Sequence, residues 1–310
     1  CHPGPHAHAT RARMPAISEQ HAIPSGMPMH AQAARPRNDS NQSAGCSLSS
    51  QKANLNMKIV SILLILLLLP ALADTAEFLT LEKGLEYREV KLDSPRPLTM
   101  IQLRCDPREI SVNLLLSTDL KGKPNSTTAG RVARELGQVA VINSSYFGHK
   151  MEILGYTERY GEVLNSDIPE GIFSAFFYWD GGRAGFKRRG ESLPSGVPVL
   201  FQAGPRLVWD GEAIGGLDSE ALANRTILSV DEEGRLGIVV IGGLAHTTLS
   251  ELPALLLKPV AQGGMASVRA LNLDGGSSTQ FYLQSGSTKK SLPGRAKVPV
   301  FLGISKRSGK

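Results

Sequence analysis

The strongest constraint on this chain is a short apolar strand that ends abruptly in an acid and two glycines. Residues 268–273 are mostly apolar and predict a buried strand. Asp274 follows at once, with Gly275, Gly276 and three hydroxyl residues behind it. A carboxylate at a strand end, beside glycines that let the backbone approach a ligand closely, is typical of a functional site. Because Asp-Gly is also a strong hairpin signal, the alternative is a tight turn into a strand over 280–283.

A second buried strand ends in the same manner. Residues 139–142 are apolar, and Asn143 follows them with two serines, Tyr146 and Phe147. Polar side chains at a strand end can bind a ligand. Asn in this position can equally satisfy the backbone of its own turn, so both interpretations stay open.

Short strands and turns make up most of the remaining sequence. Early strands are predicted over 85–92, 98–103 and 110–116, and a hairpin is predicted from 227–230 to 236–241. One helix is expected from Thr127 or Thr128 to Gly137, and a second after a capping box at 248–251 or a cap at Ser250. Since no βαβ unit repeats, we expect a single α+β domain with a mixed, mostly antiparallel sheet and a few helices.

The front of the chain carries an export signal. Residues 1–56 hold no periodic apolar run and predict a disordered or spurious extension. Lys58, the apolar run 59–69 and the small residues before Asp74 predict a signal peptide over 57–73, with cleavage after Ala73. We therefore expect a secreted or periplasmic domain over 74–310 with no stable membrane insertion after cleavage. The minority alternative is an uncleaved anchor.

Charge and motifs exclude several classes of protein. Residues 1–73 hold six Lys or Arg and two Asp or Glu, so most of the net charge of +6 belongs to that segment. No strong basic field is left over 74–310, so we expect no nucleic-acid partner. The sequence contains no G-x-S-x-G, Walker, G-x-G-x-x-G, H-E-x-x-H or C-x-x-C motif. Cys105 is alone after the signal peptide, which excludes an internal disulfide there.

Four segments in a fixed order carry a family resemblance. They are Asn143-Ser-Ser-Tyr146-Phe147, then Gln202-Ala-Gly-Pro-Arg206-Leu, then Arg225-Thr226, then Leu271-Asn-Leu-Asp274-Gly-Gly-Ser277-Ser278. Together they resemble the phosphodiester glycosidase family, over roughly residues 110–305. The resemblance implies an exported hydrolase that cleaves a sugar-1-phosphodiester bond in a glycan or envelope polysaccharide.

The resemblance also implies roles for individual residues. Asp274 is the expected key carboxylate, and the sequence leaves open whether it acts as general acid or nucleophile. Asn143 and Arg225 complete the expected catalytic set. The expected substrate-binding residues are Tyr146, Phe147, Arg206, Thr226, Gly275, Gly276, Ser277 and Ser278. No cofactor is certain, although Asp274 could hold a divalent cation such as Ca²⁺ through oxygen ligands.

Three departures from the family pattern leave other functions open. Ser144 and Ser145 replace two glycines, 241–243 reads Ile-Gly-Gly in place of Asp-Gly-Arg, and two glycines rather than three follow Asp274. One alternative is therefore a non-catalytic periplasmic or cell-surface protein that binds anionic polysaccharide with the same pocket. Another is a structural envelope protein in which the Asp-Gly-Gly stretch is only a turn.

Overall fold

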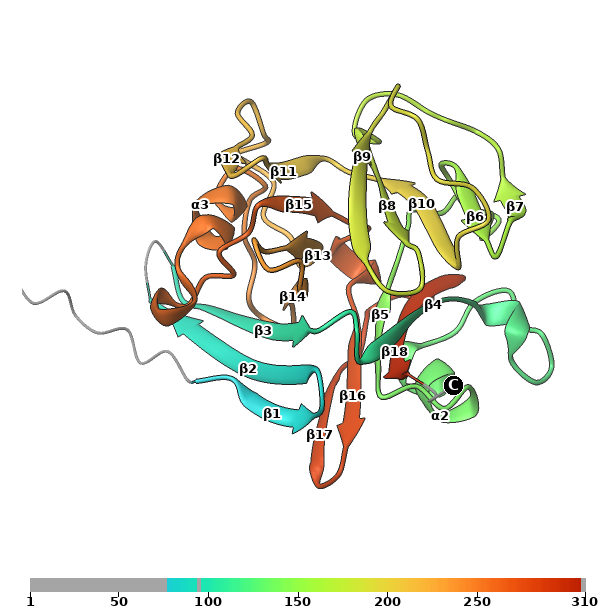
Figure 1. The fold of residues 1–310 in the computed structure, drawn as a ribbon, viewed down its shortest axis with the longest axis horizontal. Coiled ribbons are helices and arrows are strands. Elements are labelled where there is room, and N and C mark those ends of the chain that lie inside the picture. Colours follow the sequence, from blue (N-terminus) through green and yellow to red (C-terminus); the bar gives the residue numbers. More distant parts are fainter. Residues whose placement is uncertain (1–76, 94–95, 308–310) are drawn as a thin grey trace, which may run out of the picture. The chain divides into compact units, whose positions relative to one another are not determined.

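A computed structural model describes residues 77–93 and 96–307, all within the unit Leu68–Lys310. In this part of the chain, three antiparallel sheets are accompanied by two short α-helices (Figure 1). The predicted mixed, mostly antiparallel α+β class is confirmed. The predicted extension 1–56 and signal peptide 57–73 lie outside the described residues.

The largest sheet has eight strands in the order β1-β2-β3-β14-β13-β15-β11-β12. Their bounds are β1 Leu79–Glu82, β2 Leu85–Leu92, β3 Leu98–Cys105, β14 Leu236–Ile241, β13 Arg225–Val230, β15 Arg269–Asn272, β11 Arg206–Trp209 and β12 Glu212–Ala213. The predicted early strands and the predicted β13–β14 hairpin are present, and β1 is an additional edge strand that the sequence pattern did not indicate.

Two five-stranded sheets complete the described fold. The second sheet has the order β7-β6-β10-β8-β9 and the third the order β17-β16-β5-β18-β4. Their bounds are β7 Glu162–Asn165, β6 Thr157–Arg159, β10 Val199–Ala203, β8 Ala175–Trp179, β9 Ala184–Arg188, β17 Thr288–Leu292, β16 Phe281–Ser285, β5 Ala140–Asn143, β18 Val300–Lys306 and β4 Ile110–Leu116.

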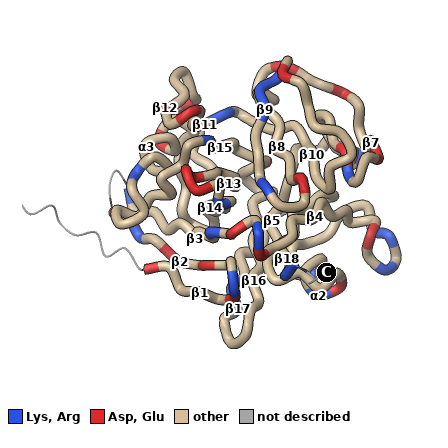
Figure 2. The backbone as a smooth tube through the Cα atoms, viewed as in Figure 1, with Lys and Arg blue, Asp and Glu red and all other residues tan. Residues whose placement is uncertain are grey.

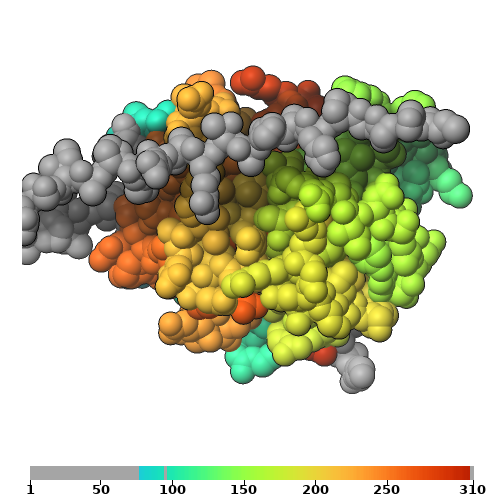
Figure 3. Space-filling view, turned by 90° about the horizontal axis from the view of Figure 1, so that it is seen from above, coloured from blue at the N-terminus to red at the C-terminus, as the bar shows by residue number. Residues whose placement is uncertain are grey.

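The eight-stranded sheet is covered on both faces, which explains why its central strands are apolar throughout. Side chains alternate along β14, so Ile238 and Val240 pack in one core cluster while Val239 and Ile241 pack in another. The first cluster includes Phe177 and Phe186 of the second sheet. Figure 3 shows the yellow-green part of the surface beside the gold part. The second cluster is closed by α3 (Leu252–Leu257).

Both helices begin differently from the simplest reading of the sequence. α2 (Ala129–Glu135) follows Thr128, but the Ala129 N–H donates to Gln280 Oε1 (2.7 Å) and the Thr128 side chain makes no cap bond. α3 begins at Leu252, later than a capping box at Thr248 predicts. The Glu251 carboxylate still accepts the Thr248 N–H (3.0 Å), and Pro253 lies in the first turn, where its missing N–H costs nothing.

The stretch that contains Asp274 passes from one sheet to another. β15 ends at Asn272 and pairs with β11 and β13, whereas β16 begins at Phe281 and pairs with β5 and β17. Because β15 and β16 belong to different sheets, the hairpin alternative for this stretch is wrong. The crossing at 273–280 instead places a carboxylate where the sheets meet.

Candidate active site

The candidate site lies at a junction of the three sheets (Figure 1). Asn143 ends β5, Thr226 lies in β13, Asp274 follows β15, and Gly204 joins β10 to β11. Backbone bonds fasten the junction: the Asp274 N–H donates to Ser144 O (3.3 Å) and the Leu273 N–H to Thr226 O (2.8 Å). Groups far apart in sequence are thus held on rigid strand ends, which is what a precise site requires.

Asn143 fixes the backbone of Asp274. Its Nδ2 donates to the Asp274 carbonyl oxygen (2.7 Å), while its Oδ1 accepts the Thr226 hydroxyl (2.7 Å) and the Gln280 N–H (3.2 Å). The side chain is buried and uses both ends of its amide. Asn143 and Thr226 are therefore positioned to orient Asp274.

The Tyr146 side chain makes a second set of hydrogen bonds that holds the junction together beside Asp274. Its hydroxyl donates to Gly204 O (2.6 Å) and accepts Asn272 Nδ2 (3.1 Å), and its ring packs edge-on against Phe173 at 5.1 Å between centroids. Burial raises the pKa of the Tyr146 phenol, and the nearby Asp274 charge raises it further. Arg225 acts in the opposite direction. The phenol thus lies within electrostatic reach of both Asp274 and Arg225.

Asp274 is a partly buried carboxylate with unusual proton affinity. Burial raises its pKa to about 6, against the opposing effects of a hydrogen bond from the Ser278 side chain and one from the Gly275 N–H (2.9 Å). Within residues 77–93 and 96–307, no Lys, Arg or His forms an ion pair with it. A carboxyl with this pKa can take up or release a proton near neutral pH.

Arg225 brings a guanidinium to the same junction. Its Nε donates to Thr247 O (3.2 Å) and its Nη2 to Ala221 O (2.8 Å), and burial lowers its pKa. No carboxylate among the described residues pairs with it. Its hydrogen-bond partners are neutral carbonyls and Asp218 acts on it without forming an ion pair, so its donors are suited to an anionic ligand.

The glycines after Asp274 are required by the backbone. A Cβ on Gly275 would lie 2.8 Å from Asn224 O, which is a clash with fixed main chain. Gly276 has φ +61° and donates its N–H to the same oxygen at 2.9 Å. Gly275 and Gly276 thus allow the loop after Asp274 to lie against the start of β13, whose first residue is Arg225.

Three predicted site residues lie apart from this cluster. Phe147 packs with the core beside α2, and Ser277 is exposed. The Arg206 guanidinium lies over the Trp209 ring, 5.3 Å from its centroid, although its backbone follows Gly204 and Pro205 at the junction. By contrast, the structure brings together Asp274, Asn143, Arg225, Tyr146, Thr226, Gly275, Gly276 and Ser278.

Several polar residues at the junction escaped prediction. Asn272 bonds Tyr146, and Gln280 connects Asn143 to the start of α2. The signal for Asn272 was its position as a polar interruption in an otherwise apolar strand. Four buried side-chain oxygens at or beside the junction have no hydrogen-bond partner: Ser144 Oγ, Ser145 Oγ, Thr279 Oγ1 and Asn272 Oδ1. Such oxygens are suited to ordered water or a ligand.

No group of three or more His, Cys, Asp or Glu side chains that could hold a metal occurs in the described part of the chain. A cation at Asp274 would therefore need hydroxyl, carbonyl or water oxygens for its remaining ligands. Calcium binding at Asp274 stays a prediction.

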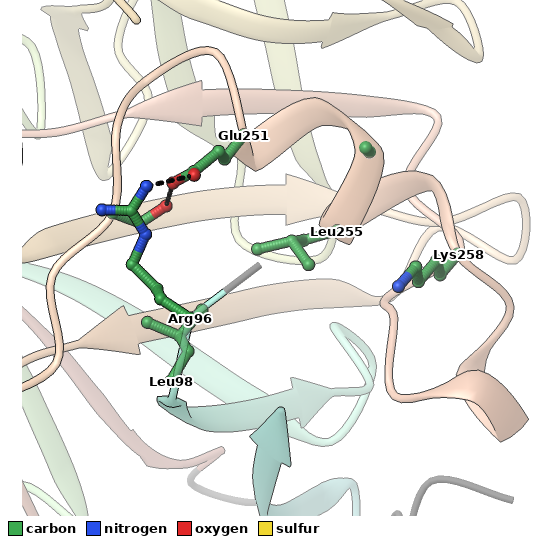
Figure 4. A pocket seen from close by; sticks show the side chains of 7 residues that line it. Arg96, Leu98, Glu251, Leu255 and Lys258 are labelled. Carbon is green, nitrogen blue, oxygen red and sulfur yellow. Dashed lines mark hydrogen bonds and ion pairs between the residues drawn. The ribbon is translucent and has the colours of Figure 1, made fainter. Parts of the chain in front are cut away.

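A cavity of about 330 Å³ lies beside α3 and is lined in part by Thr247 (Figure 4). Leu98, Ala254 and Leu255 give it apolar walls. Its acid, Glu251, accepts Arg96 Nη2 (2.7 Å) and the Thr247 hydroxyl (2.7 Å). These two charges neutralise each other, and the remaining ionisable side chain of the lining is the exposed Lys258. The cavity lining supports Thr247, whose carbonyl holds Arg225.

The fold and site define a class: an antiparallel α+β protein with one unpaired carboxylate and one unpaired guanidinium at a sheet junction. The chain belongs to the phosphodiester glycosidase family, whose model matches residues 136–305, more than half of the sequence. The predicted family resemblance is confirmed. No curated protein sequence matches the chain significantly.

Solved structures share the fold. A hypothetical protein from Synechocystis is 16% identical with a TM-score of 0.58, and the match covers 76% of this chain but only 65% of that one. The catalytic domain of zebrafish N-acetylglucosamine-1-phosphodiester alpha-N-acetylglucosaminidase, auto-inhibited by its pro-peptide, is 17% identical with a TM-score of 0.54. That match covers 76% of this chain and 87% of the zebrafish domain. At these identities the likeness establishes the fold.

Proposed function

We propose that this protein hydrolyses a sugar-1-phosphodiester, with Asp274 acting at the anomeric carbon and Arg225 on the phosphate. One observation carries the proposal. Asp274 and Arg225 are both unpaired with any other charged side chain in the described chain, yet both lie within electrostatic reach of the Tyr146 phenol. Opposite charges that form no ion pair with each other or with other side chains are available to the two reacting parts of a substrate.

The chemistry of the leaving group explains why one carboxylate suffices. Ordinary glycosidases use two, one of which protonates an alcohol-like leaving oxygen. Cleavage of the bond between the anomeric carbon and oxygen here releases a phosphomonoester, whose second pKa is about 6. Such a group departs as an anion at neutral pH without a proton donor. The remaining requirements are a base for water and a cation for the phosphate.

The proposed step follows from these two requirements. Water attacks the anomeric carbon while the ionised Asp274 takes one proton from it. The electron pair of the breaking carbon–oxygen bond stays with the phosphate oxygen, where the Arg225 guanidinium stabilises the charge. Ser278 and the Gly275 N–H hold the carboxylate in place. The products are a free sugar and a phosphomonoester.

The place of action is part of the proposal. The predicted signal peptide over 57–73 motivates export, and the substrate is then a glycan or polysaccharide of the cell envelope. Over 77–93 and 96–307, no helix is long and apolar enough to cross a membrane. N-terminal sequencing of the protein from periplasmic and secreted fractions tests this. A mature terminus at Asp74 supports export, and an intact signal segment in the cytoplasm contradicts it.

Turnover by the purified full chain tests the reaction. UDP-N-acetylglucosamine and other sugar-1-phosphodiesters are offered, and free sugar is measured beside Asp274→Asn and Asp180→Asn. Asp180 is a surface acid paired with Arg183, so its variant removes one charge away from the junction. We expect release by the parent and Asp180→Asn but not by Asp274→Asn. Release that is unchanged in Asp274→Asn contradicts the assignment.

Calcium dependence is tested in the same assay. If Asp274 holds Ca²⁺ as a structural or catalytic ligand, chelation with EDTA lowers turnover and added Ca²⁺ restores it. Equal turnover with EDTA and with Ca²⁺ contradicts the calcium prediction while leaving the role of Asp274 intact.

One observation favours the alternative of a binding protein without turnover. At the positions where the family pattern carries Asp and Arg, Ile241 is buried in the core and Gly243 is exposed at φ +68°. Arg225 therefore lacks a second guanidinium beside it from this loop. Saturable calorimetric binding of an anionic polysaccharide, with no sugar release from any substrate, supports this alternative.

A further inference from the structure

Three arginines gather around one tryptophan, away from Asp274. The guanidinium carbons of Arg188, Arg206 and Arg269 lie 5.3, 5.3 and 5.0 Å from the Trp209 ring centroid. They come from β9, β11 and β15, two of which belong to one sheet and one to another. Figure 2 shows blue Lys and Arg positions at β9 and β11. We call Arg188, Arg206, Arg269 and Trp209 the arginine cluster.

Acids neutralise only part of this cluster. Asp210 Oδ1 accepts Arg269 Nη2 (2.7 Å) and Nε (3.0 Å), and Asp210 Oδ2 accepts Arg188 Nη2 (3.3 Å). Glu191 is the other nearby acid, and its carboxylate accepts the Arg188 backbone N–H (3.1 Å). Three guanidiniums therefore share two carboxylates, and the excess positive charge falls on Arg206.

Arg206 lacks a partner of its own. Its Nε is buried without a hydrogen bond, and no acid among the described residues forms an ion pair with its guanidinium. Burial lowers its pKa, and the like charge of Arg188 lowers it further, partly offset by Glu191. A half-buried guanidinium that faces another cation costs stability unless an anion joins them.

We propose that the arginine cluster binds a phosphate group, held between Arg206 and Arg188. Guanidiniums present paired N–H donors that match two oxygens of a phosphate, and the negative charge of the phosphate offsets the repulsion between the two cations. Trp209 keeps the guanidinium planes in place, and Asp210 holds Arg269 and Arg188 from behind. No covalent step is involved.

This site is separate from the one at Asp274. Arg206 pairs with Leu271 in the ladder, so Asp274 lies three residues, or roughly 10 Å, farther along. A bulge between Arg206 and Val208 turns Arg206 toward Trp209, on the side of the sheet that packs against β9. Neither the Asp274 nor the Arg225 charge is among those that shift the pKa of Arg206.

Calorimetry on the purified full chain tests the proposal with two probes, sodium phosphate and a synthetic poly(glycerol phosphate). Arg206→Gln removes the unpaired guanidinium, and Arg206→Lys keeps the charge but loses the planar fork. Arg183→Gln is the matched control, since Arg183 is an exposed arginine paired with Asp180. Arg225→Gln reports any phosphate bound at the junction.

We expect Arg206→Gln to weaken phosphate binding at one site by at least about tenfold, with a smaller loss for Arg206→Lys and none for Arg183→Gln. Loss with both probes identifies a free phosphate site, and loss with the polymer alone identifies a subsite for a phosphodiester chain. The proposal is overturned if neither probe binds, or if binding is unchanged in Arg206→Gln. Because Arg206 makes no ion pair, its replacement leaves the fold intact, which a thermal melt checks.

Discussion

Two arginines of this protein, the buried Arg225 and the partly exposed Arg206, are held in opposite ways. Arg225 is fastened by two main-chain carbonyls, and its charge, like that of Asp274, acts on the Tyr146 phenol. Arg206 rests on Trp209 beside another arginine, and its Nε has no partner. The Arg225 guanidinium is held at a defined position by main-chain hydrogen bonds, where it is available to a ligand. The charge of Arg206 has no ion-pair partner among the described residues, so a bound anion stabilises Arg206 more.

The difference shows which of the two sites the fold holds more rigidly. The junction of three sheets fixes Asp274 through Asn143, whose amide is saturated by side-chain and backbone groups. The arginine cluster is fixed by stacking, by an acid shared between two of its members and by one bond from Arg269 Nη1 to Phe186 O (3.3 Å). A rigid, preorganised site suits bond cleavage, whereas a cluster of adaptable cations suits binding.

The largest effect is expected at Arg225. Arg225→Gln removes the cation opposite the departing phosphate, so kcat/KM should fall by roughly 100-fold or more. Arg225→Lys retains the charge without the fork and should fall less. Sugar release from UDP-N-acetylglucosamine measures both, with Arg183→Gln as the matched surface control. A fall of less than about twofold in Arg225→Gln would remove the contrast between the two arginines.

Asn143 should be the next most sensitive position. Asn143→Ala leaves the Thr226 hydroxyl, the Gln280 N–H and the Asp274 carbonyl without partners, which predicts a loss of about 3 kcal/mol in the free energy of unfolding. Urea denaturation measures it. Because Thr226 shares this network, Thr226→Val in the Asn143→Ala background should cost less than in the parent. Additive losses would mean that the two side chains do not act through one another.

Asp274 should destabilise the folded protein at neutral pH. Its folded-state pKa of about 6 exceeds the unfolded value near 3.8, so the folded protein binds the proton more tightly. Stability is therefore lost as pH rises between these values. Asp274→Asn should match the parent near pH 4 and exceed it by up to about 3 kcal/mol at pH 8. Denaturant melts at both pH values measure the difference, and a variant that is less stable than the parent at pH 8 would contradict it.

The smallest effect is expected for the stability of Arg206→Gln. The parent side chain has no ion pair to lose and repels Arg188, so the free energy of unfolding should change by less than about 1 kcal/mol. Arg225→Gln leaves two carbonyls without their hydrogen-bond donor, so its free energy of unfolding should fall by about 2 kcal/mol in the same melts. Equal losses would erase the distinction between an anchored and an uncompensated arginine.

Sequence patterns predicted much of this fold for physical reasons that can be named. The β13–β14 hairpin has apolar strands around a polar turn, and both Asp274 and Asn143 interrupt buried strands where polar groups are costly. Whether these strand ends lie close together depends on which sheet each strand joins. The spacing of residues in the sequence does not reveal this. Arg206 was predicted at the substrate because it lies in a segment that resembles the family and because a guanidinium suits a phosphate. The bulge at Arg206–Val208 sends its side chain to Trp209 instead, and alternation along a strand cannot foresee a bulge.

The pH dependence of kcat/KM for a sugar-1-phosphodiester tests the central claim most directly, because it reports the working state of Asp274. An ionised Asp274 that takes the proton from water predicts a rate that rises through about pH 6 and levels above it, with the rise absent in Asp274→Asn. A rate that falls through pH 6 would show a protonated Asp274 acting as the acid, and an identical profile in Asp274→Asn would place the catalytic carboxylate elsewhere.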